Sequence, residues 1–467
     1  MNIKFSFNIV LVTILVLHLF NCSSSGKQAI DADSEKIANN QDSIRDPKME
    51  TEKASKNVFI IKKTTAEFDY LRYSHRCYDY RYDDDDNPEI DSFVVEPGNP
   101  TYASVNGVLF TVDTTVLLIS PKSIKKFKVP ASTKKIGHYA FSHTYIEEVK
   151  LPEGLEIIEN NAFSSCYLLE PVKLPSTVKE LGANAFGCYH SWADGTICDG
   201  SGEVEIPKNS KLEKVGENAL YFNKHLYVPK HLTQDISPSI NNPYVEVDPE
   251  NAAYSSENGI LFSKDKETIY SIPNQHYDKL VIPTSVKFFA KESFFYFSAD
   301  KLVLNDHIEN LGCNISNEVG EFVIQKDDIC GADHQSDYCL VDGVLFSADT
   351  TTLIAYPVLS KRSRYVVPKN VKIIGESAFR KAKLATLVLP DGLETILEGA
   401  FAYCENLERI DIPASVSTIK GRFCFVGDSL KKIHYHGDSG NLSVGELLTE
   451  NIELIGFEGA TIEEEYE

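Results

Sequence analysis

LPEGLEIIENNAF, the stretch Leu151–Phe163, returns with few changes as LPDGLETILEGAF at Leu389–Phe401. Weaker copies of the same phrase surround both, and each places an apolar residue directly before a proline. These prolines are Pro130, Pro152, Pro175, Pro207, Pro229, Pro283, Pro368, Pro390 and Pro413. Within each run the interval is 22 or 23 residues, apart from a 32-residue interval after Pro175 that marks an insertion. A fixed period of this length predicts one array of stacked units rather than several separate globules.

Each repeat is expected to form one coil of the chain. Apolar residues alternate with polar ones before the proline, as in Val149 and Leu151, which predicts a short strand with one buried face. Proline cannot donate a hydrogen bond to a neighbouring strand, so it ends the strand and turns the chain. Apolar residues follow three and six positions later, and a phenylalanine, usually preceded by alanine, follows at position eleven, as at Phe163.

A lone coil would leave both of its flat sides exposed to water. Stacked coils bury these sides against each other and pair their strands on both edges, so only the stack is expected to fold. The phenylalanines of successive repeats should then form a file, because offset aromatic rings attract each other. Phe163 and Phe186 are predicted to be neighbours in that file.

A second recurring unit divides the array into blocks. NGVLF at 106–110, NGILF at 258–262 and DGVLF at 342–346 each place a tight-turn dipeptide before an apolar strand, which predicts a hairpin-like coil. The predicted blocks span about 92–243, 244–320 and 321–437, within a solenoid of residues 92–437. Residues 57–91 are expected to cap its start, and residues 438–467 to form a C-terminal cap and acidic tail.

These repeats resemble the BspA-type leucine-rich repeat family. LPEGLEIIENNAFSSCYLLEPV (Leu151–Val172) and LPDGLETILEGAFAYCENLERI (Leu389–Ile410) match its pattern at nearly every characteristic position, and LKKIHYHG (Leu430–Gly437) is similar to its closing segment. The resemblance implies a leucine-rich-repeat solenoid of 22–23-residue coils. Its parallel β-sheet would lie on the concave face, with short helical, 3-10 or irregular segments on the convex side. The second block departs from the pattern at SFFYF (Ser293–Phe297) and after Leu304, so less regular coils are expected there.

The N-terminus has the features of an export signal. An apolar run follows Lys4 and continues to Phe20, which predicts a signal peptide over residues 1–21. Leu19–Cys22 resembles the lipobox of bacterial lipoproteins, in which the cysteine receives a diacylglyceryl group. Cys22 would then anchor the chain to the outer membrane through lipid; the alternative is a cleaved signal in which Cys22 has no role. Residues 22–56 are polar and are predicted to form a disordered tether.

Charge and cysteine usage limit the function. The net charge of −22 disfavours nucleic acid as a partner, because phosphate binding needs clustered Lys and Arg. Among the ten cysteines, Cys166 and Cys404 occupy the same repeat position and are expected to be buried free thiols. Two pairs that flank short loops, in an exported chain, are candidate disulfides: Cys188 with Cys198, and Cys330 with Cys339. Histidines beside them, His190 and His334, lack zinc-site spacing, so no metal site or cofactor is expected.

Two segments offer candidate chemistry. The insertion carries Trp192, the chain's one tryptophan, beside His190 and Asp194. This loop is a candidate ligand contact, because exposed aromatics anchor ligands, although packing against the solenoid flank is the alternative. GDSG at 437–440 has the serine-protease spacing, but Ser439 lacks a matching histidine segment, and chance similarity is favoured. Strand alternation places His434 and His436 together on a terminal strand.

The repeats predict a scaffold, and activity on scaffolds depends on individual sites. The family resemblance implies surface or periplasmic proteins of host-associated bacteria that bind proteins, cells or glycans, and no catalytic residue carries over. We therefore expect a non-enzymatic binding or adhesion protein whose partners are host or bacterial surface proteins or polysaccharides. An envelope scaffold without an external ligand is the leading alternative, and a hydrolase is a distant one.

Overall fold

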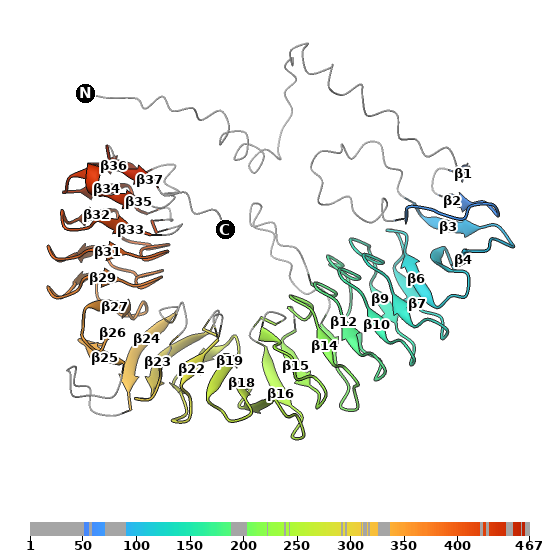
Figure 1. Ribbon diagram of the computed structural model, residues 1–467, viewed down its shortest axis with the longest axis horizontal. Helices are drawn as coiled ribbons and strands as arrows, with labels where there is room; N and C mark the ends of the chain where they lie inside the picture. The colour runs from blue at the N-terminus through green and yellow to red at the C-terminus, as the bar shows by residue number, and fades with distance from the viewer. Residues whose placement is uncertain are drawn as a thin grey trace, which may run out of the picture. The chain divides into compact units, whose positions relative to one another are not determined.

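The computed structural model describes residues 51–55, 58–70, 90–187, 203–325, 337–444 and 452–462, with short gaps. The gaps are residues 222, 238–239, 242, 291–292, 295–296, 310, 312–314, 316–317, 421–423, 426–428 and 459. Its contacts define two units: unit 1 contains residues up to 172 together with 181–203, and unit 2 contains 173–180 and 204–467. In both units the described chain is built almost entirely from short strands and turns (Figure 1).

In unit 1 the strands before Pro130 and Pro152 pair in parallel and form a first ladder. β7 (Lys126–Lys128) pairs with β9 (Glu148–Lys150), and Phe127 lies opposite Val149 in the register. The lysines on either side of Phe127 point to solvent while Phe127 is buried, as the alternation predicts. The proline carbonyl then accepts a hydrogen bond from the residue three positions later, and Leu155 N–H to Pro152 O measures 3.2 Å. Each proline therefore starts a turn, as well as ending a strand.

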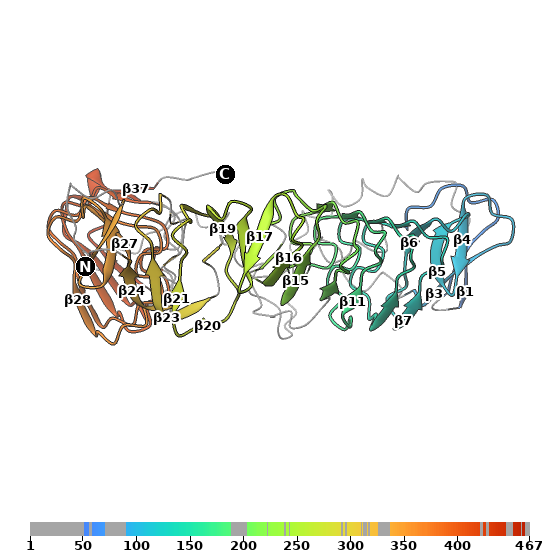
Figure 2. The same cartoon turned by 90° about the horizontal axis from the view of Figure 1, so that it is seen from below.

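Every regular coil also carries a second, two-residue strand that the sequence analysis does not anticipate. β8 (Lys135–Ile136) and β10 (Ile157–Ile158) pair in parallel, with Ile136 opposite Ile158. These strands form a second ladder, which in unit 1 runs in the order β10-β8-β6-β5-β4. Figure 2 shows β7 and β6 on opposite sides of the coils. The predicted leucine-rich repeat solenoid is confirmed, with a strand on two flanks of each coil.

The NGVLF-type units are hairpins, as predicted. β4 (Tyr102–Val105) and β5 (Val108–Thr111) run antiparallel, and Asn106 and Gly107 between them have φ angles of 50° and 83°. Positive φ at both central residues defines the tight hairpin turn that Asn-Gly favours. β5 then pairs antiparallel with β6 (Val116–Ile119), which joins the parallel ladder through β8. The hairpin converts antiparallel pairing into parallel stacking. Unit 2 repeats this arrangement in β17 (Tyr254–Glu257), β18 (Ile260–Ser263) and β19 (Thr268–Ser271), and in β25 (Tyr338–Val341), β26 (Val344–Ser347) and β27 (Thr352–Ala355).

The predicted aromatic file forms the core. In unit 1 the ring of Phe163 stacks on Phe141 and on Phe186, with both centroid distances at 4.9 Å. In unit 2 an equivalent file runs through consecutive coils from Tyr356 to Phe425, with centroid distances of 5.3, 5.7 and 5.7 Å. All of these rings are buried. The file therefore ties each coil to its neighbours through direct ring contact.

The C-terminal part of unit 2 contains two ladders. The first is a row of two parallel sheets: β28 (Arg364–Val366) pairs with β30 (Thr386–Val388), and the next sheet has the order β32 (Arg409–Ile412), β34 (Lys432–Tyr435), β36 (Glu453–Ile455). The second continues from β27 through β29 (Ile373–Ile374), β31 (Thr395–Ile396), β33 (Thr418–Ile419), β35 (Ser443–Val444) and β37 (Thr461–Ile462). Strands β35, β36 and β37 extend both ladders into the segment expected to be a cap.

The less regular block keeps parallel pairing with longer strands. β23 (Ser298–Leu304) pairs in parallel with β24 (Val319–Ile324), and β21 (Leu280–Val281) lies on its other side. At the N-terminal end, β2 (Val58–Ile61) pairs in parallel with β3 (Ser92–Val95) and antiparallel with β1 (Thr51–Ser55). β1 thus lies within the segment expected to be a disordered tether. In the described part of the chain, no helix is long and apolar enough to cross a membrane.

Candidate functional site

Most of the residues predicted to carry function lie outside the described residues: Cys22, Cys188, His190, Trp192, Asp194, Cys198 and Cys330. Cys339 lies on β25, where its side chain is buried and disulfide-bonded. The other half of that bond is outside the described residues, so its pairing with Cys330 stays a prediction.

The predicted buried thiols are confirmed. Cys166 and Cys404 are free, and each thiol donates a hydrogen bond to the carbonyl of a core phenylalanine, Phe141 at 3.0 Å and Phe379 at 3.2 Å. Burial raises the pKa of both thiols to about 12. Cys424, which the sequence analysis did not single out, is a third buried free thiol and precedes the core residue Phe425 in the alanine position of the repeat. These thiols fill the core and are not placed for chemistry.

Unit 1 exposes a group of apolar side chains that we call the tyrosine ledge: Tyr145, Tyr167 and Leu168. They are 54%, 50% and 53% exposed. The two tyrosines occupy the same position on consecutive coils, 22 residues apart. The residues directly before the two tyrosines lie against each other, since the Thr144 hydroxyl is 3.6 Å from the Cys166 sulfur. The ledge thus lies on two coils that stack directly on each other.

The described chain stops before the insertion, one coil after the ledge. Gly187 is the last described residue before it, and its carbonyl accepts a 3.1 Å hydrogen bond from Ser165 N–H. Repeat spacing makes Gly187 equivalent to Ser164 in the coil before, three positions ahead of Tyr167. The insertion that contains Trp192 therefore begins where the two preceding coils carry the ledge.

The outer face of the first ladder in unit 1 is charged. Glu148 forms ion pairs with Lys126 on the neighbouring strand, at 3.1 Å, and with Lys150 on its own strand, at 2.9 Å. The bonds to Lys150 and Lys126 lower the pKa of the Glu148 carboxyl. Such exposed pairs contribute little to stability.

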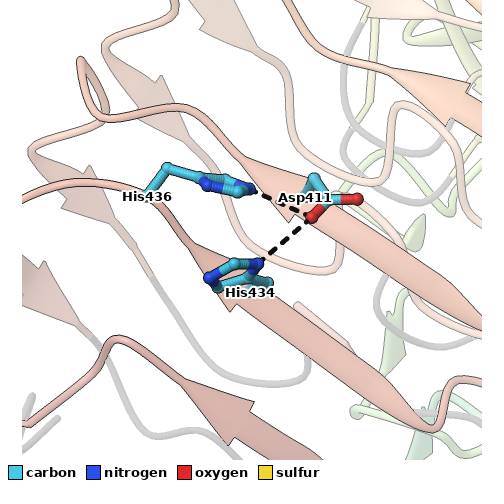
Figure 3. A group of neighbouring side chains, drawn as sticks. All are labelled: Asp411, His434 and His436. Atoms are coloured by element: carbon cyan, nitrogen blue, oxygen red, sulfur yellow. Dashed lines mark hydrogen bonds and ion pairs between the residues drawn. The ribbon is translucent and has the colours of Figure 1, made fainter.

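In unit 2 the outer face of the first ladder carries what we call the His–Asp cluster: Asp411, His434 and His436 (Figure 3). Asp411 on β32 lies directly opposite His434 on β34 in the parallel register. Its Oδ1 atom is 3.0 Å from His436 Nε2 and 3.5 Å from His434 Nδ1. The two imidazole rings pack with centroids 4.0 Å apart. One carboxylate oxygen thus faces two imidazoles at the protein surface.

Arg409 also binds the carboxylate of the cluster, and its Nη2 atom lies 3.5 Å from His434 Nδ1. Its Nη2 and Nε atoms donate to Asp411 Oδ1 and Oδ2 at 2.6 and 2.9 Å. The bond from Arg409, and after it the bond from His436, lowers the pKa of the Asp411 carboxyl to about 2. The guanidinium is half exposed, so this two-point contact is open to solvent.

His434 and His436 lie together, as predicted from strand alternation. Their predicted placement on a terminal strand is wrong, because β34 lies between β32 and β36 in the sheet. Ser439 lies in the 3-10 helix η4 (Ser439–Asn441), where its hydroxyl donates to the Glu458 carbonyl. Both imidazoles face Asp411, and Ser439 is engaged with backbone.

Within the described residues, two groups of side chains could hold a metal ion, although none is expected from the sequence. The His–Asp cluster is one, and His276, Asp278 and Asp300 form the other, with all three exposed. The sequence does contain a sign of the His–Asp cluster, because His434 follows Asp411 by 23 residues, which is one repeat interval. Residues one interval apart face each other across stacked coils.

The coils, with a strand before each proline and a file of aromatic rings, define a leucine-rich repeat protein. Six copies of the BspA type leucine rich repeat region match the chain, at residues 119–226 and 360–458. These two segments of the chain are therefore leucine-rich repeat regions of the BspA type. No curated protein matches it.

The chain is also similar to solved structures of other repeat proteins. Pneumococcal vaccine antigen PcpA shows 20% sequence identity and a TM-score of 0.42, with 79% of this chain and 88% of that chain covered. A leucine rich cell surface protein from Faecalibacterium prausnitzii A2-165 shows 17% identity and a TM-score of 0.41, with 78% and 94% covered. A leucine-rich repeat protein from Bacteroides ovatus shows 17% identity and a TM-score of 0.29, with 78% and 90% covered.

Proposed function

We propose that this chain is a non-enzymatic binding or adhesion protein of the bacterial cell envelope, which presents its repeat surface to protein or glycan ligands. The observation that carries the proposal is the tyrosine ledge of Tyr145, Tyr167 and Leu168, each at least half exposed. A tyrosine offers a flat apolar face and a polar tip, which suits both sugar rings and protein side chains. Neighbouring exposed apolar side chains on a folded protein typically mark an interaction site.

The position of the ledge supports an extended ligand. Stacked coils repeat the same surface position at each turn, so a ligand can contact several coils in succession. The insertion that carries Trp192, His190 and Asp194 begins at the end of the same row, after Gly187. We propose that Trp192 adds a third aromatic contact, since tryptophan and tyrosine contribute strongly at binding hot spots.

The test is a binding screen of the full chain against glycans and matrix proteins, followed by variants. Tyr145→Ala/Tyr167→Ala should weaken binding of any captured ligand by tenfold or more, since a hot-spot residue contributes about 2 kcal/mol. Tyr403→Ala is the matched control, because Tyr403 is 46% exposed but lies in unit 2, under the Arg380 guanidinium. Binding by Trp192→Ala is measured separately, to test whether Trp192 contributes to the same contact.

Three outcomes separate the alternatives. Loss of binding in the double variant, with Tyr403→Ala unaffected, supports the proposed surface. Equal loss in both variants would place the binding site elsewhere. A chain that captures no glycan or protein under these conditions is instead an envelope scaffold without an external ligand.

We also propose that the chain is exported and anchored by lipid at Cys22. The support is the apolar run that ends at Phe20, two residues before Cys22. Two acyl chains give stable anchoring where one gives only marginal binding. Cys22→Ala should move the protein from the membrane fraction to the soluble fraction, and protease treatment of intact cells should show whether the anchored chain faces outward or the periplasm. Retention of Cys22→Ala in the membrane fraction would contradict the lipid anchor.

A further inference from the structure

The His–Asp cluster has the composition of a metal site. Imidazole nitrogens suit zinc, copper and nickel ions, and a carboxylate oxygen completes many zinc sites. We propose that Asp411, His434 and His436 form a binding site for a divalent transition-metal ion of the zinc class. This site is separate from the tyrosine ledge and does not depend on the proposed binding function.

The spacing of the ligand atoms fits such an ion. In a tetrahedral site with metal–ligand distances of about 2.0–2.1 Å, two ligand atoms lie about 3.3 Å apart. Asp411 Oδ1 lies 3.0 Å from His436 Nε2 and 3.5 Å from His434 Nδ1, which brackets that separation. All three ligand atoms lie within 4.8 Å of one another. Small side-chain rotations suffice to surround an ion.

The backbone beneath the cluster is held in place. β32 and β34 pair in parallel with Asp411 opposite His434, and His436 N–H donates to the Ile412 carbonyl at 3.0 Å. Ligands on paired strands keep their relative positions better than ligands on loops. The imidazoles and the carboxylate are partly exposed, so an ion can enter from solvent and keep a water molecule in its fourth position.

Arg409 competes with the ion for Asp411. Its guanidinium donates to both carboxylate oxygens, and its positive charge would lie close to the bound cation. Because this side chain is half exposed, it can turn into solvent when an ion binds. Removing its charge should therefore tighten binding, because a positive charge this close to a bound cation repels it.

The second group, His276, Asp278 and Asp300, provides a matched control. It offers one imidazole, whose Nε2 lies 3.7 Å from Asp300 Oδ1 and 4.0 Å from Asp278 Oδ1. A single nitrogen donor and wider spacing suit zinc-class ions less well than two imidazoles do. Replacing His276 should leave the tightest binding unchanged.

The experiment is calorimetric titration of the full chain, stripped with chelator, with Zn²⁺, and electron paramagnetic resonance with Cu²⁺. His434→Ala/His436→Ala should bind one ion fewer per chain, while His276→Ala keeps that ion. The Cu²⁺ spectrum of the unmodified chain should show coupling to imidazole nitrogens that the double variant loses. Mg²⁺ and Ca²⁺ should not compete, because they prefer oxygen ligands.

Arg409→Gln supplies a test that misfolding cannot imitate, since a gain in affinity requires an intact site. Tighter Zn²⁺ binding in Arg409→Gln, together with the loss in the double variant, supports the proposal. The same ion count and the same Cu²⁺ spectrum in the double variant as in the unmodified chain would overturn it. So would an equal loss in His276→Ala.

Discussion

The rings of Phe163 and Phe186 lie parallel, with centroids 4.9 Å apart and 5° between their planes. The two residues belong to consecutive coils and are 23 residues apart in sequence. Phe141 stacks on the other face of Phe163 with the same centroid distance. A buried ring between two others is thus shared by three coils, so each coil depends on its neighbours for its core.

Phe163→Ala should therefore destabilise more than one coil. The side chain is buried, and removal of a buried phenylalanine costs about 3–5 kcal/mol because a cavity replaces the ring. Urea unfolding, followed by circular dichroism, measures the change in the free energy of unfolding. Phe288→Ala is the control, because Phe288 is partly exposed on β22 (Phe288–Phe289) and should cost less than about 1 kcal/mol. Similar losses in the two variants would show that the file is not the main support of the stack.

The aromatic file could be predicted because its evidence is local. The phenylalanine of each repeat, such as Phe163, stands at a fixed distance after the proline, and burial follows from that spacing. The second ladder could not be predicted in the same way. A strand of two residues, such as Ile157–Ile158, is too short to show alternation, and its pairing depends on the coils on either side.

The His–Asp cluster was only half predictable. His434 and His436 are separated by one residue, so strand alternation places both on one face. Asp411 joins them through the register of β32 and β34, which no local pattern specifies. A search for charged residues that lie one repeat interval apart would have found the cluster.

Buried asparagines show a further contact that local pattern misses. Asn251 is fully buried; its amide group donates to the carbonyls of Pro229 and Leu232, at 2.8 and 2.9 Å. Its carbonyl oxygen accepts from the N–H groups of Ala253 and Tyr254, both at 2.9 Å. The side chain therefore fixes the proline turn of the coil before it. Asn99 makes the corresponding four bonds in unit 1.

Asn251→Ala should cost about 3 kcal/mol, because it leaves buried backbone groups without partners. Thermal and urea unfolding give the change in stability. Asn406→Ala is the matched control: the Asn406 amide also donates to a carbonyl of the coil before, that of Lys383, but at an exposed position. It should change the free energy of unfolding by less than about 0.5 kcal/mol. If Asn251→Ala lowers the free energy of unfolding as little as the control does, water replaces the lost hydrogen bonds and the turn does not need the side chain.

His143 should make the chain less stable in mild acid. Burial, with a smaller contribution from Lys122, lowers the pKa of His143 to about 4, compared with about 6.5 for a histidine in an unfolded chain. Between these values the unfolded state binds the proton more readily, so stability is complete above about pH 6.5 and falls as pH decreases towards 4. The difference corresponds to a loss of about 3 kcal/mol at most.

Comparison with His143→Asn isolates this contribution. Asparagine suits the position, because His143 has a φ angle of 55° and asparagine tolerates left-handed backbone. Between pH 7.5 and pH 4.5, the unmodified chain should lose about 2 kcal/mol more of its unfolding free energy than the variant does. Identical pH dependence of the two proteins, measured by urea unfolding, would show that folding does not lower the pKa of His143.

The three buried free thiols should resist alkylation in the folded chain. Burial raises the pKa of Cys166 and Cys404 to about 12 and that of Cys424 to about 11. The thiolate is the reactive form, so at pH 8 these residues carry almost none of it, and the packing around them also blocks access. Iodoacetamide labelling followed by peptide mass spectrometry should find them unmodified under native conditions and fully modified in urea. Native labelling of Cys166 at the rate of an exposed cysteine would mean that the coils around Phe141 open readily, contrary to a core that stacked neighbours hold closed.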